Sequence, residues 1–128
     1  MLPFARVEVA VEFIEVARVS DLPVGRVKSV KVLAETIALY HTAKGFFASE
    51  SRCPHRGGPL TEGDVILAKG DITHDEIVCP WHLWGFNLEN GLCPGNPDIC
   101  ITMHEVKVDG DRVLVRLAPV RETTSNLS

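Results

Sequence analysis

Two short loops, each carrying one cysteine and one histidine, constrain what this chain can fold into more than any other feature. They read Cys53-Pro54-His55-Arg56-Gly57-Gly58-Pro59-Leu60 and Cys79-Pro80-Trp81-His82-Leu83-Trp84-Gly85-Phe86. The proline and glycine residues around the cysteines favour tight loops without repetitive structure. The spacing is C-x-H in the first loop and C-x2-H in the second. Two thiolates and two imidazoles from two matched loops predict a metal site.

The choice of metal follows from how the ligands are arranged. Zinc fingers pair their cysteines on one arm and place their histidines three to five residues apart on a helix. Here each arm is mixed, and neither lies in helix-like sequence. A Rieske [2Fe-2S] centre needs two cysteines on one iron and two histidines on the other. The chain therefore resembles the Rieske iron-sulfur family, and one Rieske-type [2Fe-2S] cluster is the expected cofactor, with zinc as the alternative.

The resemblance implies a role for each residue of the two motifs. Cys53 and Cys79 are expected to bind one iron, and His55 and His82 the other. Residues expected near the cluster belong to the same loops or to a later proline loop like the one that covers the cluster in this family: Arg56, Gly57, Gly58, Pro80, Trp81, Trp84, Pro94 and Pro97. Trp81 fits either an apolar rim for a partner or packing beneath the loops, and packing is favoured for Trp84. The other histidines, His41, His74 and His104, are expected to be ordinary strand or surface residues.

Four positions bear on the reduction potential through the same resemblance. In quinol-oxidising Rieske proteins, a serine and a tyrosine after the second histidine donate hydrogen bonds to the sulfurs, and a disulfide joins the two loops. Trp84 and Phe86 stand at the hydroxyl positions here, and Gly58 and Trp81 at the disulfide positions. Hydrogen bonds to sulfur favour the more negative reduced state. Their absence predicts a low-potential centre.

The rest of the chain predicts an all-β antiparallel domain with the two cluster-binding loops at one tip. Short runs of β-forming residues alternate with turn signals about every ten residues, and there is no convincing helix. The expected strands are 11–17, 26–33, 36–42, 46–49, 63–67, 76–78, 85–88, 101–108 and 113–117. Between His55 and Cys79 lie 23 residues, more than is usual in small Rieske ferredoxins, and the surplus is expected in an extended hairpin or loop at 67–76. We expect an N-terminal extension at 1–10, the Rieske domain at 11–117 and a mobile tail at 118–128.

Length and composition limit the function classes. A chain of 128 residues with 45% hydrophobic and 23% charged residues suits one globular domain. No apolar run approaches a membrane span, and no signal peptide is evident, so a cytoplasmic protein is expected. The net charge of −4 argues against nucleic acid as a partner and suits a basic docking face on a redox partner.

Two further cysteines, Cys93 and Cys100, remain after the ligand cysteines are assigned. They could form a disulfide, but in a reducing cytosol free thiols are expected. Cys93 follows the second loop closely and could pack near the cluster. A small buried side chain is the simpler interpretation.

These features predict one-electron transfer by a component of an oxidoreductase rather than by an independent catalyst. The chain has no dinucleotide-binding G-x-G-x-x-G and no room for the mononuclear iron domain of a complete Rieske oxygenase. Its motifs most resemble the small subunit of NAD(P)H-dependent nitrite reductase, which implies a reductase and a terminal oxidoreductase as partners. A ferredoxin of a ring-hydroxylating oxygenase system is the alternative. From a different class, a zinc-stabilised interaction module remains open.

Overall fold

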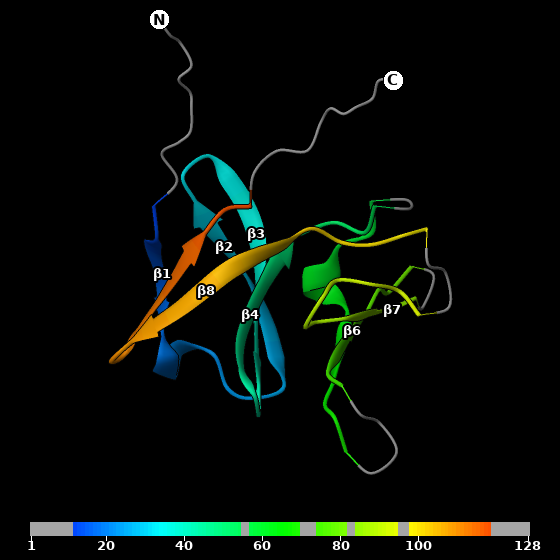
Figure 1. Cartoon of the computed structure of the whole chain (residues 1–128), viewed down its shortest axis with the longest axis horizontal. Coiled ribbons are helices and arrows are strands. Elements are labelled where there is room, and N and C mark those ends of the chain that lie inside the picture. Colours follow the sequence, from blue (N-terminus) through cyan, green and yellow to red (C-terminus); the bar gives the residue numbers. More distant parts are fainter. Residues whose placement is uncertain (1–11, 55–56, 70–73, 82–83, 95–97, 119–128) are drawn as a thin grey trace, which may run out of the picture.

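The computed structural model describes residues 12–54, 57–69, 74–81, 84–94 and 98–118, and they form an antiparallel all-β fold (Figure 1). The elements are β1 (Ile14–Arg18), η2 (Val19–Asp21), β2 (Arg26–Val32), β3 (Glu35–Thr42), β4 (Gly45–Glu50), η3 (Leu60–Glu62), β5 (Asp64–Ile66), β6 (Glu76–Val78), β7 (Gly85–Asn87), β8 (Met103–Asp109) and β9 (Arg112–Arg116). Both η elements are single turns of 3-10 helix. The expected all-β antiparallel class is confirmed.

The strands form two sheets of unequal size. The larger has the order β1-β9-β8-β4-β3-β2, and its edge strands β1 and β2 contact each other, so this sheet curls on itself. The smaller has the order β5-β6-β7 and lies beside the larger one (Figure 1). Each expected strand is present, with bounds that match or shift by up to three residues. Because β6 and β7 flank the second cysteine-histidine loop and β4 leads into the first, the small sheet and the end of β4 position the site.

Strand β3 separates two hydrophobic cores. Its residues Ile37 and Leu39 pack with Val113 and other apolar residues of the larger sheet. The alternate residues, Ala38 and Tyr40, face a second core. This second core joins β3 to the small sheet and contains both motif cysteines: its buried residues are Ala38, Tyr40, Cys53, Leu60, Ile77, Cys79, Phe86, Leu88, Cys93 and Ile101. Side chains of a strand alternate between its faces, so a strand buried on both sides serves both cores.

The turn between β2 and β3 carries an unfavourable residue. Val32 pairs with Glu35, which leaves Leu33 and Ala34 as a two-residue loop. Leu33 has a φ of 57°, in the left-handed region that glycine and asparagine adopt most readily, and its side chain is 73% exposed. The turn is therefore held in place by the strand pairing on either side of it.

Replacing Leu33 with glycine is expected to stabilise the protein. The substitution relieves a left-handed backbone strain of about 1 kcal/mol and removes almost no packing. Chemical denaturation should show a higher free energy of unfolding. The gain should be smaller than the relieved strain, because glycine adds conformational freedom to the unfolded chain. Ala34→Gly in the same turn is the matched control and should give no gain, because Ala34 has no positive φ. A loss of stability in Leu33→Gly would contradict the prediction.

Several expectations concern residues that the structure does not describe. The N-terminal extension at 1–10 lies outside the described residues, as does the tail from 119 onward. Ala118, where the mobile tail was expected to begin, is described, and its backbone N–H donates a hydrogen bond of 2.9 Å to Nδ1 of His104. In the described part of the chain, no helix has the length and hydrophobicity that a membrane span requires.

Candidate metal centre

The first loop is closed by its own backbone. The N–H of Cys53 donates to the carbonyl of Gly58 at 2.8 Å, and the N–H of Gly57 donates to the carbonyl of Cys53 at 2.7 Å. Gly57 adopts a φ of 75°, which glycine tolerates without strain. Arg52 adds a side-chain hydrogen bond from Nη1 to the carbonyl of Gly57 at 2.9 Å. The loop is thereby tightly constrained, and Cys53 is held with its side chain buried.

The second loop begins directly after β6. The N–H of Cys79 donates to the carbonyl of Trp84 at 2.9 Å, which closes the loop at the start of β7. Cys79 is fully buried, whereas Pro80 is exposed and Trp81 is 57% exposed. Trp84 is half-buried and packs against the core that holds Cys79, so the packing role expected for it is confirmed.

The two loops touch each other at Gly58. A Cβ atom placed on Gly58 would lie 2.8 Å from Sγ of Cys79 and 3.1 Å from Cγ of Trp81, so no side chain fits there. Residues more than twenty positions apart in sequence are therefore in close contact. The structure places Cys53 and Cys79 in one hydrophobic core.

Four of the residues predicted at the site lie outside the described part of the chain. These are the two expected histidine ligands, His55 and His82, together with Arg56 and Pro97. Among the described residues, no group of three or more histidine, cysteine, aspartate or glutamate side chains is arranged to hold a metal ion. Pro94 is described and exposed, ahead of the expected proline loop. The assignment of the ligands thus remains a prediction.

The described residues fit a metal cluster held between the loops. Both motif thiols are buried, and they lie in two loops that are each closed by hydrogen bonds and that touch each other. Soft thiolate ligands are the ones that iron-sulfur clusters use. The apolar core around the thiols, which includes Phe86, provides the low-polarity shell that tunes such centres.

A family model for the Rieske [2Fe-2S] domain matches residues 12–103. This chain belongs to that family. Its cofactor is a Rieske-type [2Fe-2S] cluster, and its activity is electron transfer of the ferredoxin type, as the motifs predict. The match covers both loops and strands β1 to β7.

Relatives of about the same length as this Rieske chain include oxygenase ferredoxins and a nitrite reductase small subunit. It is 29% identical to the ferredoxin component of the alkene monooxygenase system of Xanthobacter autotrophicus, over 86% of this chain and 85% of that protein. It is 32% identical to the ferredoxin component of the naphthalene 1,2-dioxygenase/salicylate 5-hydroxylase systems of Ralstonia sp, over 82% of this chain and 95% of that protein. It also resembles the structure of a putative NADH-dependent nitrite reductase small subunit from Mycobacterium tuberculosis, with a TM-score of 0.77 at 19% identity, over 88% of this chain and all of that chain. Some other relatives are much longer, and the chain spans only 16% of their length.

The remaining cysteines of the Rieske domain, Cys93 and Cys100, lie at a short β-bridge. Leu92 pairs with Cys100 in this bridge, and both side chains are exposed. Cys93, the next residue, is buried in the same core as the motif cysteines. Neighbouring positions along an extended chain point to opposite faces, so a disulfide between Cys93 and Cys100 is disfavoured. The structure shows both as free thiols, and their state in the cell stays a prediction.

A buried polar pair in the cluster-side core was not anticipated from the sequence. The hydroxyls of Tyr40 and Ser49 are 2.7 Å apart, and both residues are fully buried on the adjacent strands β3 and β4. Burial raises the pKa of the Tyr40 phenol far above its usual range, against the smaller opposing effect of the hydrogen bond from Ser49. The Tyr40 phenol therefore stays protonated, and its hydroxyl finds a hydrogen-bond partner in Ser49 inside the core. The available signal was a serine at the end of the apolar run Phe46-Phe47-Ala48, which the hairpin pairing places opposite Ala38 and diagonal to Tyr40.

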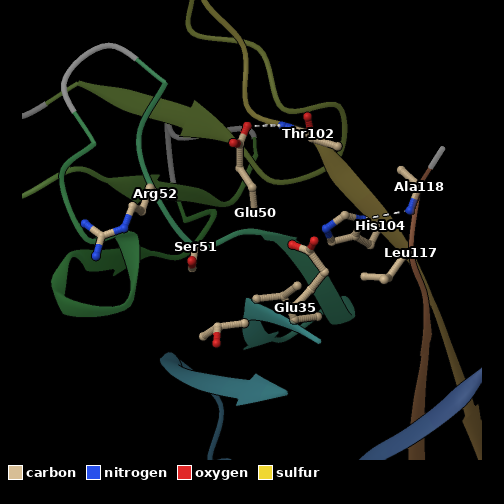
Figure 2. A pocket seen from close by; sticks show the side chains of 10 residues that line it. Glu35, Glu50, Ser51, Arg52, Thr102, His104, Leu117 and Ala118 are labelled. Carbon is tan, nitrogen blue, oxygen red and sulfur yellow. Dashed lines mark hydrogen bonds between the residues drawn. The ribbon is translucent and has the colours of Figure 1, made fainter. Parts of the chain in front are cut away.

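A cavity of about 370 Å³ with both polar and apolar lining lies where β3, β4 and β8 meet, just before the first loop (Figure 2). Glu35, Glu50, Arg52 and His104 are among its lining residues. Glu50 accepts a hydrogen bond from the backbone N–H of Thr102 at 2.7 Å (Figure 2). His104 lies on β8, away from both motifs, as expected.

His104 should make folding stability depend on pH. Its half-buried imidazole accepts the N–H of Ala118 on Nδ1, and burial lowers its pKa from 6.5, against the smaller opposing effect of Glu35. The unfolded chain then binds a proton at a higher pH than the folded chain does. The free energy of unfolding should therefore fall as the pH drops from about 6.5 through the lower folded pKa.

Denaturation curves at about pH 7.5 and at about pH 5 test this effect of His104. His104→Asn is the control, because its amide oxygen can accept the same hydrogen bond but does not titrate. The variant should lose less stability than the parent protein between the two pH values. Equal losses in the two proteins would contradict the prediction.

Proposed function

We propose that Cys53 and Cys79 bind one iron of the cluster as thiolates and that His55 and His82 bind the other. The support for the cysteine half is geometric, since both thiols are buried in one core and the Cys79 sulfur lies at the contact between the loops. The support for the histidine half is the motif spacing, one C-x-H and one C-x2-H. A His82→Cys variant should retain a cluster with a spectrum shifted toward that of all-cysteine centres. An unchanged spectrum would show that His82 is not a ligand.

The two loops hold the cysteines in place and determine which surface lies near the cluster site. When bound, the cluster accepts and returns one electron. The first loop holds Cys53 through two backbone hydrogen bonds, and the second holds Cys79 through one. Both cysteines are buried in the core, and Pro80 and Trp81, which follow Cys79 in the chain, are exposed. Electron exchange with a partner is expected across this surface of the two loops.

We propose that the chain serves as the ferredoxin of an oxygenase system, with a reductase as electron donor and the oxygenase as acceptor. The observation that carries this proposal is its 32% identity to the Ralstonia ferredoxin component over 95% of that protein. A net charge of −4 suits basic docking faces on both partners. The proposed location is the cytoplasm.

The small subunit of an NAD(P)H-dependent nitrite reductase is a second candidate. Its specific support is the sequence Cys53-Pro54-His55-Arg56-Gly57-Gly58-Pro59-Leu60 together with the Asn90-Gly91 turn, which resemble that subunit. At 19% identity, the structural similarity to the Mycobacterium tuberculosis protein supports the fold alone. The two candidates differ in the enzyme that receives the electron.

Co-purification from the native host separates the two candidates. The tagged chain is isolated anaerobically, and the proteins bound to it are identified by mass spectrometry. An oxygenase or its reductase would support the first candidate, and a sirohaem and flavin enzyme would support the second. A Cys79→Ser variant carried through the same procedure shows which partners require the loaded site.

A zinc-stabilised interaction module would have no redox role, and colour distinguishes it directly. A Rieske protein is red-brown and bleaches on reduction, whereas a zinc protein is colourless. Metal analysis of the purified chain should give iron and acid-labile sulfide in equal amounts. Zinc in a colourless protein would overturn the proposed function.

A further inference from the structure

The contact between the two loops is asymmetric. The first loop contributes the backbone of Gly58, whose carbonyl is tied to the N–H of Cys53 at 2.8 Å. The second loop contributes Sγ of Cys79 and the indole of Trp81. Gly58 is thus coupled to one motif cysteine by a hydrogen bond and to the other by direct contact. Movement of either loop would change the distance between the two thiols.

The fit at this contact leaves no spare space. A Cβ on Gly58 would approach Sγ of Cys79 to 2.8 Å and the Cγ and Cδ2 atoms of Trp81 to 3.1 and 3.2 Å. Real Cβ atoms essentially never come within the first of these distances, because atomic repulsion rises steeply there. The absence of a side chain at position 58 is what allows the indole to lie against the first loop.

Trp81 has two environments. One edge of its ring lies against Gly58, while the residue as a whole is 57% exposed. Cys79, two positions earlier, is fully buried. An exposed tryptophan contributes little to a hydrophobic core, so its packed edge is the part with a structural consequence. That edge covers the place where the two loops meet beside the Cys79 sulfur.

We propose that Trp81 and Gly58 form a noncovalent clamp that holds the two loops at the spacing the cluster needs and keeps water from the Cys79 sulfur. The clamp rests on the proposed ligand role of Cys79, and Trp81 acts in it as a positioning residue. Loss of the indole would leave the two sheets intact but let the loops separate. The cluster would then be released faster, although all its ligands remain.

The test measures how fast the loaded protein loses its cluster to an iron chelator, followed by visible absorbance. Trp81→Ala should lose the cluster about ten times faster than the parent protein, in line with other residues that support metal ligands. Trp81→Phe keeps a flat ring against Gly58 and should restore most of the retention. Gly58→Ala should also release the cluster faster, because its Cβ forces the loops apart. Val24→Ala, which removes a comparably exposed apolar side chain at 51% exposure, should behave as the parent does.

Two controls make the outcome specific to the clamp. Thermal unfolding of the cluster-free proteins should differ little between the parent and Trp81→Ala, and the visible circular dichroism of the loaded variant should differ from that of the parent. Parent-like release by Trp81→Ala, or equally fast release by Val24→Ala, would overturn the clamp. A parent protein without a Rieske spectrum would instead overturn the proposed function.

Discussion

Replacing Cys79 with serine is expected to abolish the cluster. Cys79 is fully buried, its N–H closes the second loop on Trp84, and its sulfur lies at the contact with Gly58. A hydroxyl is a much poorer ligand for iron in a cluster than a thiolate is. Iron content of the purified variant should fall to about one tenth of the parent value or less, given a loss of at least tenfold in affinity. Cys53→Ser should give the same result.

The chain supplies its own matched controls for this prediction. Cys93 is buried in the same core as Cys79, and Cys100 is an exposed thiol. Neither belongs to a C-x-H or C-x2-H motif, so Cys93→Ser and Cys100→Ser should keep normal iron content. Cys93→Ser also shows what a serine costs in stability at a buried site of this core. A cluster retained by Cys79→Ser and lost by Cys93→Ser would contradict the ligand assignment.

The sequence predicts the strands of this fold well because most of them alternate or carry clear turn signals. The Asn90-Gly91 turn and the Lys44-Gly45 turn end strands where expected, and Gly91 and Gly45 both have positive φ. The single turns of 3-10 helix at η2 and η3 are too short to leave a periodic pattern. The left-handed Leu33 could not be foreseen, because leucine rarely adopts that conformation.

The stretch at 67–76, where the surplus residues are expected in an extended hairpin or loop, covers the connection between β5 and β6, and its form beyond the paired strands stays a prediction. Strands β5 and β6 pair antiparallel up to Ile66 and Glu76, and residues 70–73 of the connection lie outside the described part. Asp75 is buried at the base of this connection and accepts the N–H of Ala68 at 2.8 Å. The sequence gives no sign of this burial, since an aspartate in a polar stretch is usually exposed.

The site was predictable only in part. Paired motifs identify the ligand candidates, since few other chemistries need one cysteine and one histidine from each of two loops. The contact of Gly58 with Cys79 and Trp81 depends on how β4 and the small sheet are arranged in space. Local sequence patterns carry no information on such long-range packing. The buried pair of Tyr40 and Ser49 lies instead on one predicted hairpin, and its hydrogen bond follows from the pairing of β3 with β4.

The reduction potential should lie near the low end of the Rieske range, at about −150 mV rather than about +300 mV. Phe86 is fully buried in the core that holds both motif thiols, and it carries no hydroxyl. Trp84, half-buried beside it, also lacks one. Neither residue can therefore donate a hydroxyl hydrogen bond that would stabilise the more negative, reduced cluster. Protein-film voltammetry that gave a midpoint above about +100 mV would contradict this prediction.

A hydroxyl added at the right place should raise that potential. Phe86→Tyr keeps the ring and adds one donor, and a net hydrogen bond of about 1 kcal/mol to the reduced state corresponds to about 40 mV for one electron. Phe46→Tyr is the matched control, because Phe46 packs against the other core, on the far side of β3, and its hydroxyl should leave the potential unchanged. Equal shifts in both variants would mean that the effect is not local to the thiols. A rise confined to Phe86→Tyr would show that the missing hydroxyl at this position is one reason for the low potential.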